Sequence, residues 1–234
     1  MTEPAKPHDG FQIQFSYTNK DTYWKRSITC PTARQLIILL ILLSTAGLLG
    51  FAIKVYLDST QDEPILITRF DWLAQPPATP VSTIKTPLAL VIIHHTATSP
   101  CDSKPQCILA TRNIQEYHIA SKGWSDIGYN FLIGGDGRAY EGRGWTGCGA
   151  HTIGYNNRSL GVGFIGTFTV DQPAENQLRA FDRLTKMGVE SGYLVEDFTI
   201  FSASQLSGTK SPGEAFADVI KTWSRWNNYS IATN

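Results

Sequence analysis

The longest apolar run of the chain lies between Gln35 and Ile53 and reads QLIILLILLSTAGLLGFAI. It contains no charged residue, and leucine and isoleucine would occupy every face of a helix formed by it. At 1.5 Å per residue, such a helix nearly spans a hydrocarbon core of about 30 Å. The pattern predicts a membrane span, and a buried helix of a soluble protein is the weaker alternative.

Charged residues on either side of this run predict its orientation. Basic residues precede it at Lys20, Lys25, Arg26 and Arg34. Only Lys54 follows closely, and acidic residues come next. The positive-inside rule therefore places the N-terminus in the cytoplasm and the C-terminal part outside the cell or in a lumen. A cleaved signal peptide fits less well because residues 1–34 precede the apolar core.

These patterns divide the chain into five parts, of which one is a large folded domain. The expected parts are a cytoplasmic tail at 1–34, a transmembrane signal anchor at 35–57, a stalk at 58–67, the folded domain at 68–228 and a C-terminal tail at 229–234.

The folded domain mixes strand-like and helix-like patterns along its length. Leu88 to Ile93 is an unbroken apolar run rich in β-branched residues, which predicts a strand buried on both faces. Further strands are expected at 129–133, 138–145, 160–168 and 198–201, and helices at 106–121, 173–190 and 211–226. The last helix should begin with Ser211 as its N-cap. The mixture predicts an α/β domain with a central mixed β-sheet flanked by helices.

The overall charge excludes one class of partner. The chain has 20 basic and 20 acidic residues, and the formal net charge is zero. The folded domain shows no stripe of basic residues along a strand or a helix. We therefore expect no binding of nucleic acid, which needs clustered positive charge.

Cysteine positions suggest an oxidising environment for the folded domain. Cys101 and Cys107 lie six residues apart, and outside the cytoplasm a small-loop disulfide is the natural interpretation. Cys148 would then lack a partner within the domain. It is either a buried free thiol or a cysteine that pairs between chains.

Two adjacent histidines end the first buried strand. His94 and His95 point to opposite faces because side chains alternate along a strand. Only one of them can therefore face a given cleft. The pair alone fits either a structural role or metal binding.

The order of motifs resembles the peptidoglycan recognition protein family, which is similar to bacteriophage-type N-acetylmuramoyl-L-alanine amidases. The segments that carry the resemblance are VIIHHTATSPC, KGWSDIGYNFLIGGDGRAYEGRGW, GAHTIGYN, LGVGFIGTF and TKSPG. Together they cover about residues 66–228. The chain looks like an insect, membrane-anchored, long-form member, and the resemblance implies the amidase-like fold and the disulfide between Cys101 and Cys107.

Catalytic members of this family bind one zinc ion through two histidines and a cysteine, with a tyrosine beside the metal. The first histidine matches His94, and the tyrosine matches Tyr129. Ala203 occupies the position of the second histidine, and Ser211 that of the cysteine. Since a catalytic zinc needs three protein ligands and one open position, the resemblance implies no cofactor and no enzymatic activity here.

Loss of zinc does not abolish binding, because the family's groove also holds the muramyl peptide. The positions expected to contact such a ligand are His94, Trp124, Tyr129, Arg143, Trp145, Thr146, Gly147, His151, Asn157 and Arg158. Trp124 and Trp145 are also candidates for the core.

Two departures leave the ligand open. Thr146 and Gly147 match neither the pattern for lysine-type stems nor that for diaminopimelate-type stems. The arginine that holds the diaminopimelate carboxylate in some members is replaced by Asn157, and Arg158 lies one position further on. Asn157 and Asn228 each begin an N-glycosylation sequon, and a glycan on Asn157 would lie at the groove rim.

We therefore expect a non-catalytic receptor or co-receptor of innate immunity in the cell membrane that binds bacterial peptidoglycan or muramyl peptides. A regulator that has lost ligand binding and pairs with related receptors is the alternative, and homodimers or heterodimers fit either role. A zinc-dependent amidase is the third and least favoured possibility.

Overall fold

A computed structural model describes residues 44, 47–51 and 65–230. The chain divides into two units, one within residues 1–63 and the other within residues 64–234. Residues 44 and 47–51 are helical. Most of the predicted anchor at 35–57 lies outside the described residues, as does the tail at 1–34. Within the described part of the chain, no helix is both long and apolar enough to cross a bilayer.

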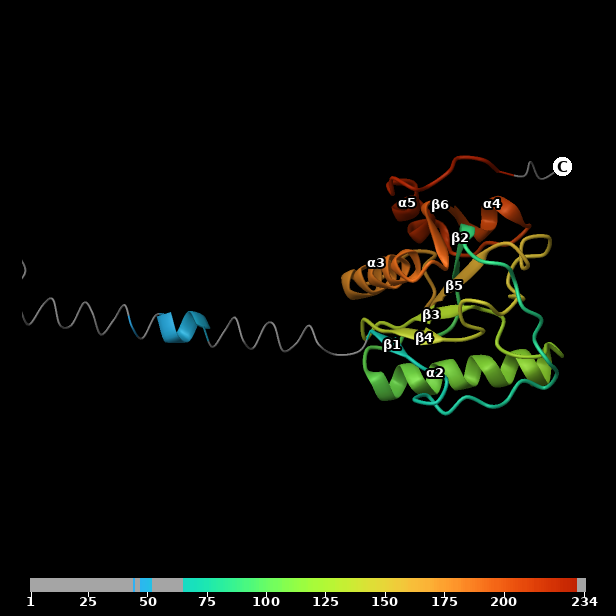
Figure 1. The fold of residues 1–234 in the computed structure, drawn as a ribbon, viewed down its shortest axis with the longest axis horizontal. Coiled ribbons are helices and arrows are strands. Elements are labelled where there is room, and N and C mark those ends of the chain that lie inside the picture. Colours follow the sequence, from blue (N-terminus) through green and yellow to red (C-terminus); the bar gives the residue numbers. More distant parts are fainter. Residues whose placement is uncertain (1–43, 45–46, 52–64, 231–234) are drawn as a thin grey trace, which may run out of the picture. The chain divides into compact units, whose positions relative to one another are not determined.

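A six-stranded mixed sheet forms the centre of the C-terminal unit, with the strand order β1-β4-β3-β5-β2-β6 (Figure 1). The strands are Leu66–Ile67 (β1), Leu88–His95 (β2), Phe131–Ile133 (β3), Ala139–Glu141 (β4), Leu160–Phe164 (β5) and Leu194–Ser202 (β6). β3 and β4 form an antiparallel hairpin, and the remaining neighbours pair in parallel. The predicted mixed sheet is therefore confirmed.

Helices cover both faces of this sheet (Figure 1). They are Lys104–Glu116 (α2), the π-helical turn Tyr117–Ser121 (η1) that continues it, Glu175–Glu190 (α3), Ala203–Leu206 (α4) and Glu214–Lys221 (α5). α2 lies on one side of the sheet, whereas α3 and α5 lie on the other. The predicted helices at 106–121 and 173–190 correspond to α2 with η1 and to α3.

Alternation along the strands divides the core into two layers. Phe131 and Ile133 pack into the layer beneath α3 and α5, whereas Leu132 between them packs into the layer beneath α2. All three side chains are fully buried. This is the pattern expected of a strand that is covered on both faces.

The start of the last helix differs from the prediction. α5 begins at Glu214 with Gly213 as its N-cap, and it ends at Lys221. Ser211 is not the cap, because its hydroxyl oxygen accepts a hydrogen bond from the backbone N–H of His95 at 3.0 Å. Gly213 has a φ of 95°, a conformation that favours glycine.

Two edge elements also differ from the prediction. β1 precedes Thr68, where the sequence places the start of the domain, and β6 begins at Leu194 instead of Phe198. β6 gains a further partner where Ile200 forms a parallel bridge with Trp226. Turns at residues 222–225 separate this bridge from the end of α5, so the helix does not reach Trp226.

Candidate functional site

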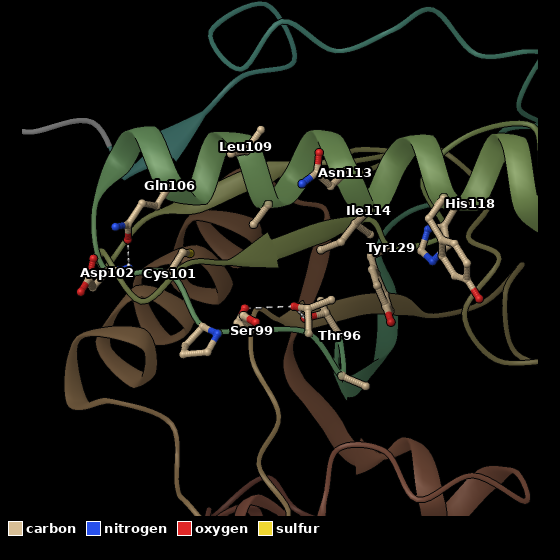
Figure 2. A pocket seen from close by; sticks show the side chains of 15 residues that line it. Thr96, Ser99, Cys101, Asp102, Gln106, Leu109, Asn113, Ile114, His118 and Tyr129 are labelled. Atoms are coloured by element: carbon tan, nitrogen blue, oxygen red, sulfur yellow. Dashed lines mark hydrogen bonds between the residues drawn. The ribbon is translucent and has the colours of Figure 1, made fainter.

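A groove of about 870 Å³ lies between α2 and the loop that follows β2 (Figure 2). Its lining includes Thr96, Asp102, Asn113, Tyr117, His118 and Tyr129. The groove therefore combines hydroxyl and amide groups with aromatic rings. Such a lining suits a ligand that has both sugar-like polar groups and apolar faces.

A disulfide fixes one end of this groove. Cys101 and Cys107 are bonded, which confirms the predicted pair and ties the loop after β2 to the first turns of α2. Both cysteines are buried. Cys148 is half-buried and forms no disulfide with any described cysteine.

His94 lies in a buried polar cluster at the end of β2. Its Nε2 atom lies 3.1 Å from the Thr152 hydroxyl oxygen, and the same oxygen lies 3.1 Å from Nδ1 of His151. A hydroxyl donates only one hydrogen bond, so at least one of the two imidazoles donates to the Thr152 oxygen. Thr152 thus contacts both rings through one oxygen atom.

Burial keeps both of these imidazoles neutral. Burial, assisted by His151 and His95, holds the pKa of His94 well below its ordinary value. Burial and the charge of Arg143 lower the pKa of His151 to about 3. The Nε2 atom of His151 is buried without a hydrogen-bond partner among the described residues. Neither ring carries charge at neutral pH.

Tyr129 lies between His94 and His118. Its ring centroid is 5.5 Å from that of His94 and 5.7 Å from that of His118. The ring also lies against Gly163, where a Cβ atom would come within 3.0 Å of it. Burial raises the pKa of Tyr129 to about 12, so its hydroxyl group remains protonated.

His118 is a lining residue that the sequence did not single out. Its Nδ1 atom accepts a hydrogen bond from the backbone N–H of Gly128 at 3.0 Å, and its ring lies 4.7 Å from that of Trp124. Burial lowers its pKa to about 4, and Arg143 and Lys122 act in the same direction. Its position four residues after buried Ile114 was the available signal.

The positions that hold zinc in catalytic relatives do not supply a metal site here. Ala203 is fully buried and has no donor atom, and the Ser211 hydroxyl is engaged by the backbone of His95. Among the described residues, no group of three or more histidine, cysteine, aspartate or glutamate side chains could hold a metal ion. The residues present do not fit the zinc ion of the amidase reaction.

Arg143 and Trp145 lie in structural positions. The Arg143 guanidinium donates hydrogen bonds to the carbonyl oxygens of Ile127, Asp126 and Cys148. The Trp145 ring packs 4.4 Å from Phe131 and stacks 5.2 Å from Tyr193. Arg143 therefore stabilises neighbouring loops, and Trp145 packs in the core. Neither side chain lines the groove.

The remaining predicted site residues lie on neighbouring loops. Thr146 is exposed, and its carbonyl oxygen accepts a hydrogen bond from Ile84. Gly147 is buried and bridges to Thr83.

The two candidate residues of the loop after His151 face solvent. Asn157 and Arg158 are exposed, and the Arg158 guanidinium lies 4.5 Å from the Tyr155 ring centroid. Asn228, the second predicted glycosylation site, is also exposed. The structure therefore brings His94, Tyr129 and His151 together, and Trp124 is linked to this group through His118. Of the predicted ligand-binding residues, Tyr129 alone lines the groove.

Comparison with known proteins gives a consistent result. The sequence profile of the N-acetylmuramoyl-L-alanine amidase family matches residues 85–214. Peptidoglycan-recognition protein LE of Drosophila melanogaster is 41% identical over 163 residues, which cover 70% of this chain and 47% of that protein. Peptidoglycan-recognition protein SC2 of the same species is 36% identical over 193 residues, which cover 82% of this chain and 97% of that protein.

Solved structures show the same fold. Bumblebee PGRP-SA is 44% identical with a TM-score of 0.68, and the match covers 71% of this chain and 99% of that one. A second match is the ectodomain complex of peptidoglycan recognition proteins LCa and LCx with tracheal cytotoxin. It is 42% identical with a TM-score of 0.69, and it covers 70% of this chain and 98% of that one.

Proposed function

This chain belongs to the peptidoglycan recognition protein family, and from that premise we propose that it is a non-catalytic receptor or co-receptor that binds bacterial peptidoglycan. The observation that carries the proposal is a groove lined by Tyr129, with His94 beside that ring and with Ala203 and Ser211 at the other two positions that the resemblance assigns to zinc. Binding needs the groove, whereas hydrolysis needs the metal.

The chemistry of the groove supports binding of a muramyl peptide. Leu109 on α2 and Tyr117 at the start of η1 are more than half exposed and offer apolar surface to sugar rings. Thr96, Thr98 and Asn113 add hydroxyl and amide groups that can exchange hydrogen bonds with a glycan or peptide. A site of this kind is mostly apolar with a few oriented polar groups.

The donor atoms around His94 support the absence of hydrolysis. A catalytic zinc takes three protein ligands and activates a water molecule at the fourth position. His94 alone cannot retain the ion, and its Nε2 atom is already engaged with Thr152. We therefore propose that the chain recognises the ligand and leaves it intact.

We also propose that the domain is displayed outside the cell by a single span at residues 35–57. The uncharged run from Gln35 to Ile53 and the basic residues before it support this orientation. The disulfide between Cys101 and Cys107 fits the same proposal, because such bonds persist in oxidising compartments. Ligand binding outside would then modulate immune signalling through the tail at 1–34.

A regulator that pairs with related receptors is the second candidate. Exposed Asn157 begins a sequon in the loop that contacts His94 through Thr152, and a glycan there would add bulk to that loop. The solved complex of LCa and LCx shows an assembly of two different relatives on one ligand. In this role the chain would form heterodimers, whereas a receptor clusters as homodimers or heterodimers.

Calorimetry with the full chain in detergent separates the two roles. Soluble muramyl tripeptides should bind to the wild-type chain, and Tyr117→Ala should weaken binding because it removes an exposed ring from the groove wall. Leu73→Ala is the matched control, since Leu73 is a large exposed residue that does not line the groove. Failure of every fragment to bind would leave the regulator as the better assignment.

A further inference from the structure

Two large apolar side chains are exposed to solvent on the turn that follows β1. Phe70 is 86% exposed and Leu73 is 64% exposed. The backbone N–H of Leu73 donates to the carbonyl oxygen of Phe70 at 3.2 Å, so both belong to one turn, which we call the entry turn (residues 68–73). Trp72 beside them is fully buried, and its Nε1–H donates to the carbonyl oxygen of Glu141 at 2.8 Å. The turn therefore buries one aromatic ring and exposes another.

Polar contacts hold the entry turn against the domain. The Arg69 guanidinium forms an ion pair with buried Asp126 at 3.0 Å and donates to the carbonyl oxygen of Gly142 at 2.7 Å. The Asp71 carboxylate accepts hydrogen bonds from the backbone N–H and the hydroxyl of Thr68, at 3.0 and 2.7 Å. The two exposed apolar side chains are therefore presented on a well-supported turn.

The backbone of Leu73 has an unusual conformation for its residue type. Its φ is 56°, in the left-handed region that is costly for any residue with a Cβ atom. Glycine or asparagine adopts this region more readily. Leucine gains little burial here in return, because its side chain remains in water. A conformation of this kind is a reason to look for a contact outside the domain.

The chain that follows the entry turn extends this surface almost without charge. Between Phe70 and Ile84, Asp71 is the one residue with a formal charge. Residues 75–80, QPPATP, are all exposed. They begin beside α2, where the Gln115 side chain bonds to the backbone N–H and carbonyl of Gln75 at 2.9 and 3.0 Å (Figure 1).

The entry turn is also the part of the domain that is attached most directly to the proposed span. The stalk residues 58–64 can extend by about 25 Å at most, and the turn begins three residues after Ile65. Among the described residues of this domain, the next large exposed apolar side chain is Leu109, which lines the groove. A short tether keeps a bilayer near the turn at a high effective concentration.

We propose that the entry turn docks on the outer lipid surface, with Phe70 and Leu73 inserted at the boundary between headgroups and acyl chains. This interaction surface goes beyond ligand recognition, and it rests on the single span at residues 35–57 of the proposed function. Aromatic and leucine side chains are typical of segments that bind at this boundary. Docking would fix the orientation of the domain on the membrane.

The charge of Asp71 limits the depth of insertion. Hydrogen bonds from Thr68 lower the pKa of Asp71, so its carboxylate is ionised at neutral pH. An ionised group stays among the headgroups, where it can pair with the ammonium group of a zwitterionic lipid. The adjacent apolar side chains then reach about 5–10 Å into the interface, as in other interfacial segments.

Lipid fits this surface better than a folded partner protein does. A stable protein interface buries about 800 Å² on each side and uses roughly 20–30 residues. The entry turn offers two large apolar side chains, followed by a proline-rich segment. Docking on a bilayer needs no such area, because the span already holds the domain at the membrane.

Lipid photo-crosslinking of the full chain in phosphatidylcholine nanodiscs tests this proposal. The probe is a phosphatidylcholine with a diazirine on the acyl chain close to the headgroup, and mass spectrometry identifies the labelled peptides. We expect labelling of residues 35–57 and of residues 66–80. Labelling of 35–57 alone, or equal labelling over the whole domain surface, overturns the docking proposal and leaves the span standing. Absence of label from 35–57 overturns both.

Substitution of the two exposed side chains tests their role. Phe70→Ser combined with Leu73→Asn should lower the labelling of residues 66–80 by roughly 5- to 10-fold, because the apolar contact with lipid is lost. Asparagine tolerates the left-handed backbone, so the turn should be retained. Ile153→Ser combined with Val170→Ser is the matched control, since it removes two exposed apolar side chains from other loops and should preserve the labelling.

Two further measurements distinguish lipid contact from other roles of the turn. Phe70→Ser alone leaves the backbone of Leu73 unchanged and should give intermediate labelling with an unchanged melting temperature. Equal labelling in wild type and the Phe70/Leu73 double variant would refute the proposal. Dissociation of a dimer by this variant, with no label on residues 66–80 in wild type, would assign the turn to a second chain instead.

Discussion

Acidification should destabilise the C-terminal domain through its buried histidines, and His118 gives the clearest test. Its folded pKa is about 4, against 6.5 for a free histidine. Between these values the unfolded chain binds a proton that the folded domain does not. The free energy of unfolding is therefore highest above pH 6.5, as far as His118 is concerned, and falls as the pH decreases. For one histidine, each pH unit lowers it by about 1.4 kcal/mol. From pH 6.5 to 5, the loss from His118 is about 2 kcal/mol.

His151 adds to this loss. Its folded pKa of about 3 implies a further loss of about 2 kcal/mol over the same interval. The pKa of His94 is shifted in the same direction. A domain with a total stability of about 5–15 kcal/mol would therefore lose a large part of it at pH 5.

The assay is urea unfolding of the full chain at pH 5, 6 and 7, followed by tryptophan fluorescence. His118→Asn retains an oxygen that can accept the hydrogen bond of Gly128 but does not titrate, so it should lower the pH-dependent loss by about 2 kcal/mol. His8→Asn is the control, because His8 lies outside the unit 64–234. Carboxyl groups contribute little between pH 5 and 7. An identical pH dependence in wild type and His118→Asn would refute this reasoning.

Three further predictions concern other parts of the domain. Thr152→Val should lower the free energy of unfolding by about 2 kcal/mol, because it removes the hydroxyl that contacts two buried imidazoles. Chemical denaturation measures this change. Thr199→Val is the control and should change the free energy of unfolding little, because the Thr199 hydroxyl has no hydrogen bond with a described residue. Reduction of the Cys101–Cys107 disulfide should lower the free energy of unfolding by about 2 kcal/mol, because the bond closes a short loop. An unchanged melting temperature in reductant would contradict this. Asn157→Gln should abolish one glycosidase-sensitive mass shift of the chain expressed in insect cells, and a shift that persists would place the glycan elsewhere.

The sequence predicts the interior of this fold better than its edges. Leu88 to Ile93 is apolar without interruption because β2 pairs with strands on both sides and is covered on both faces. β1 is only two residues long, too short for any periodicity, and it exists because β4 offers it a partner. The local sequence around Ser211 is typical of a helix N-cap, but its hydroxyl oxygen accepts a hydrogen bond from His95 of β2, which is distant in sequence.

The same limit applies to the site. His94 and Tyr129 could be placed from motifs because each lies in a short, distinctive segment, and the structure places their rings 5.5 Å apart. The roles of Arg143 and Trp145 could not be predicted from motifs, because they depend on tertiary contacts. Arg143 binds backbone carbonyl oxygens, and Trp145 packs against rings of the core. Thr152 was not identified for the same reason, because its importance comes from contacts with two histidines in space.

Recognition without cleavage is tested most directly by incubation of the full chain with polymeric peptidoglycan and added zinc. Co-sedimentation measures binding, and mass spectrometry of the supernatant measures released stem peptides. With Ala203 and Ser211 at two of the three metal positions, we expect the chain to sediment with the polymer and to release no stem peptide. Release that a chelator abolishes and zinc restores would contradict this account.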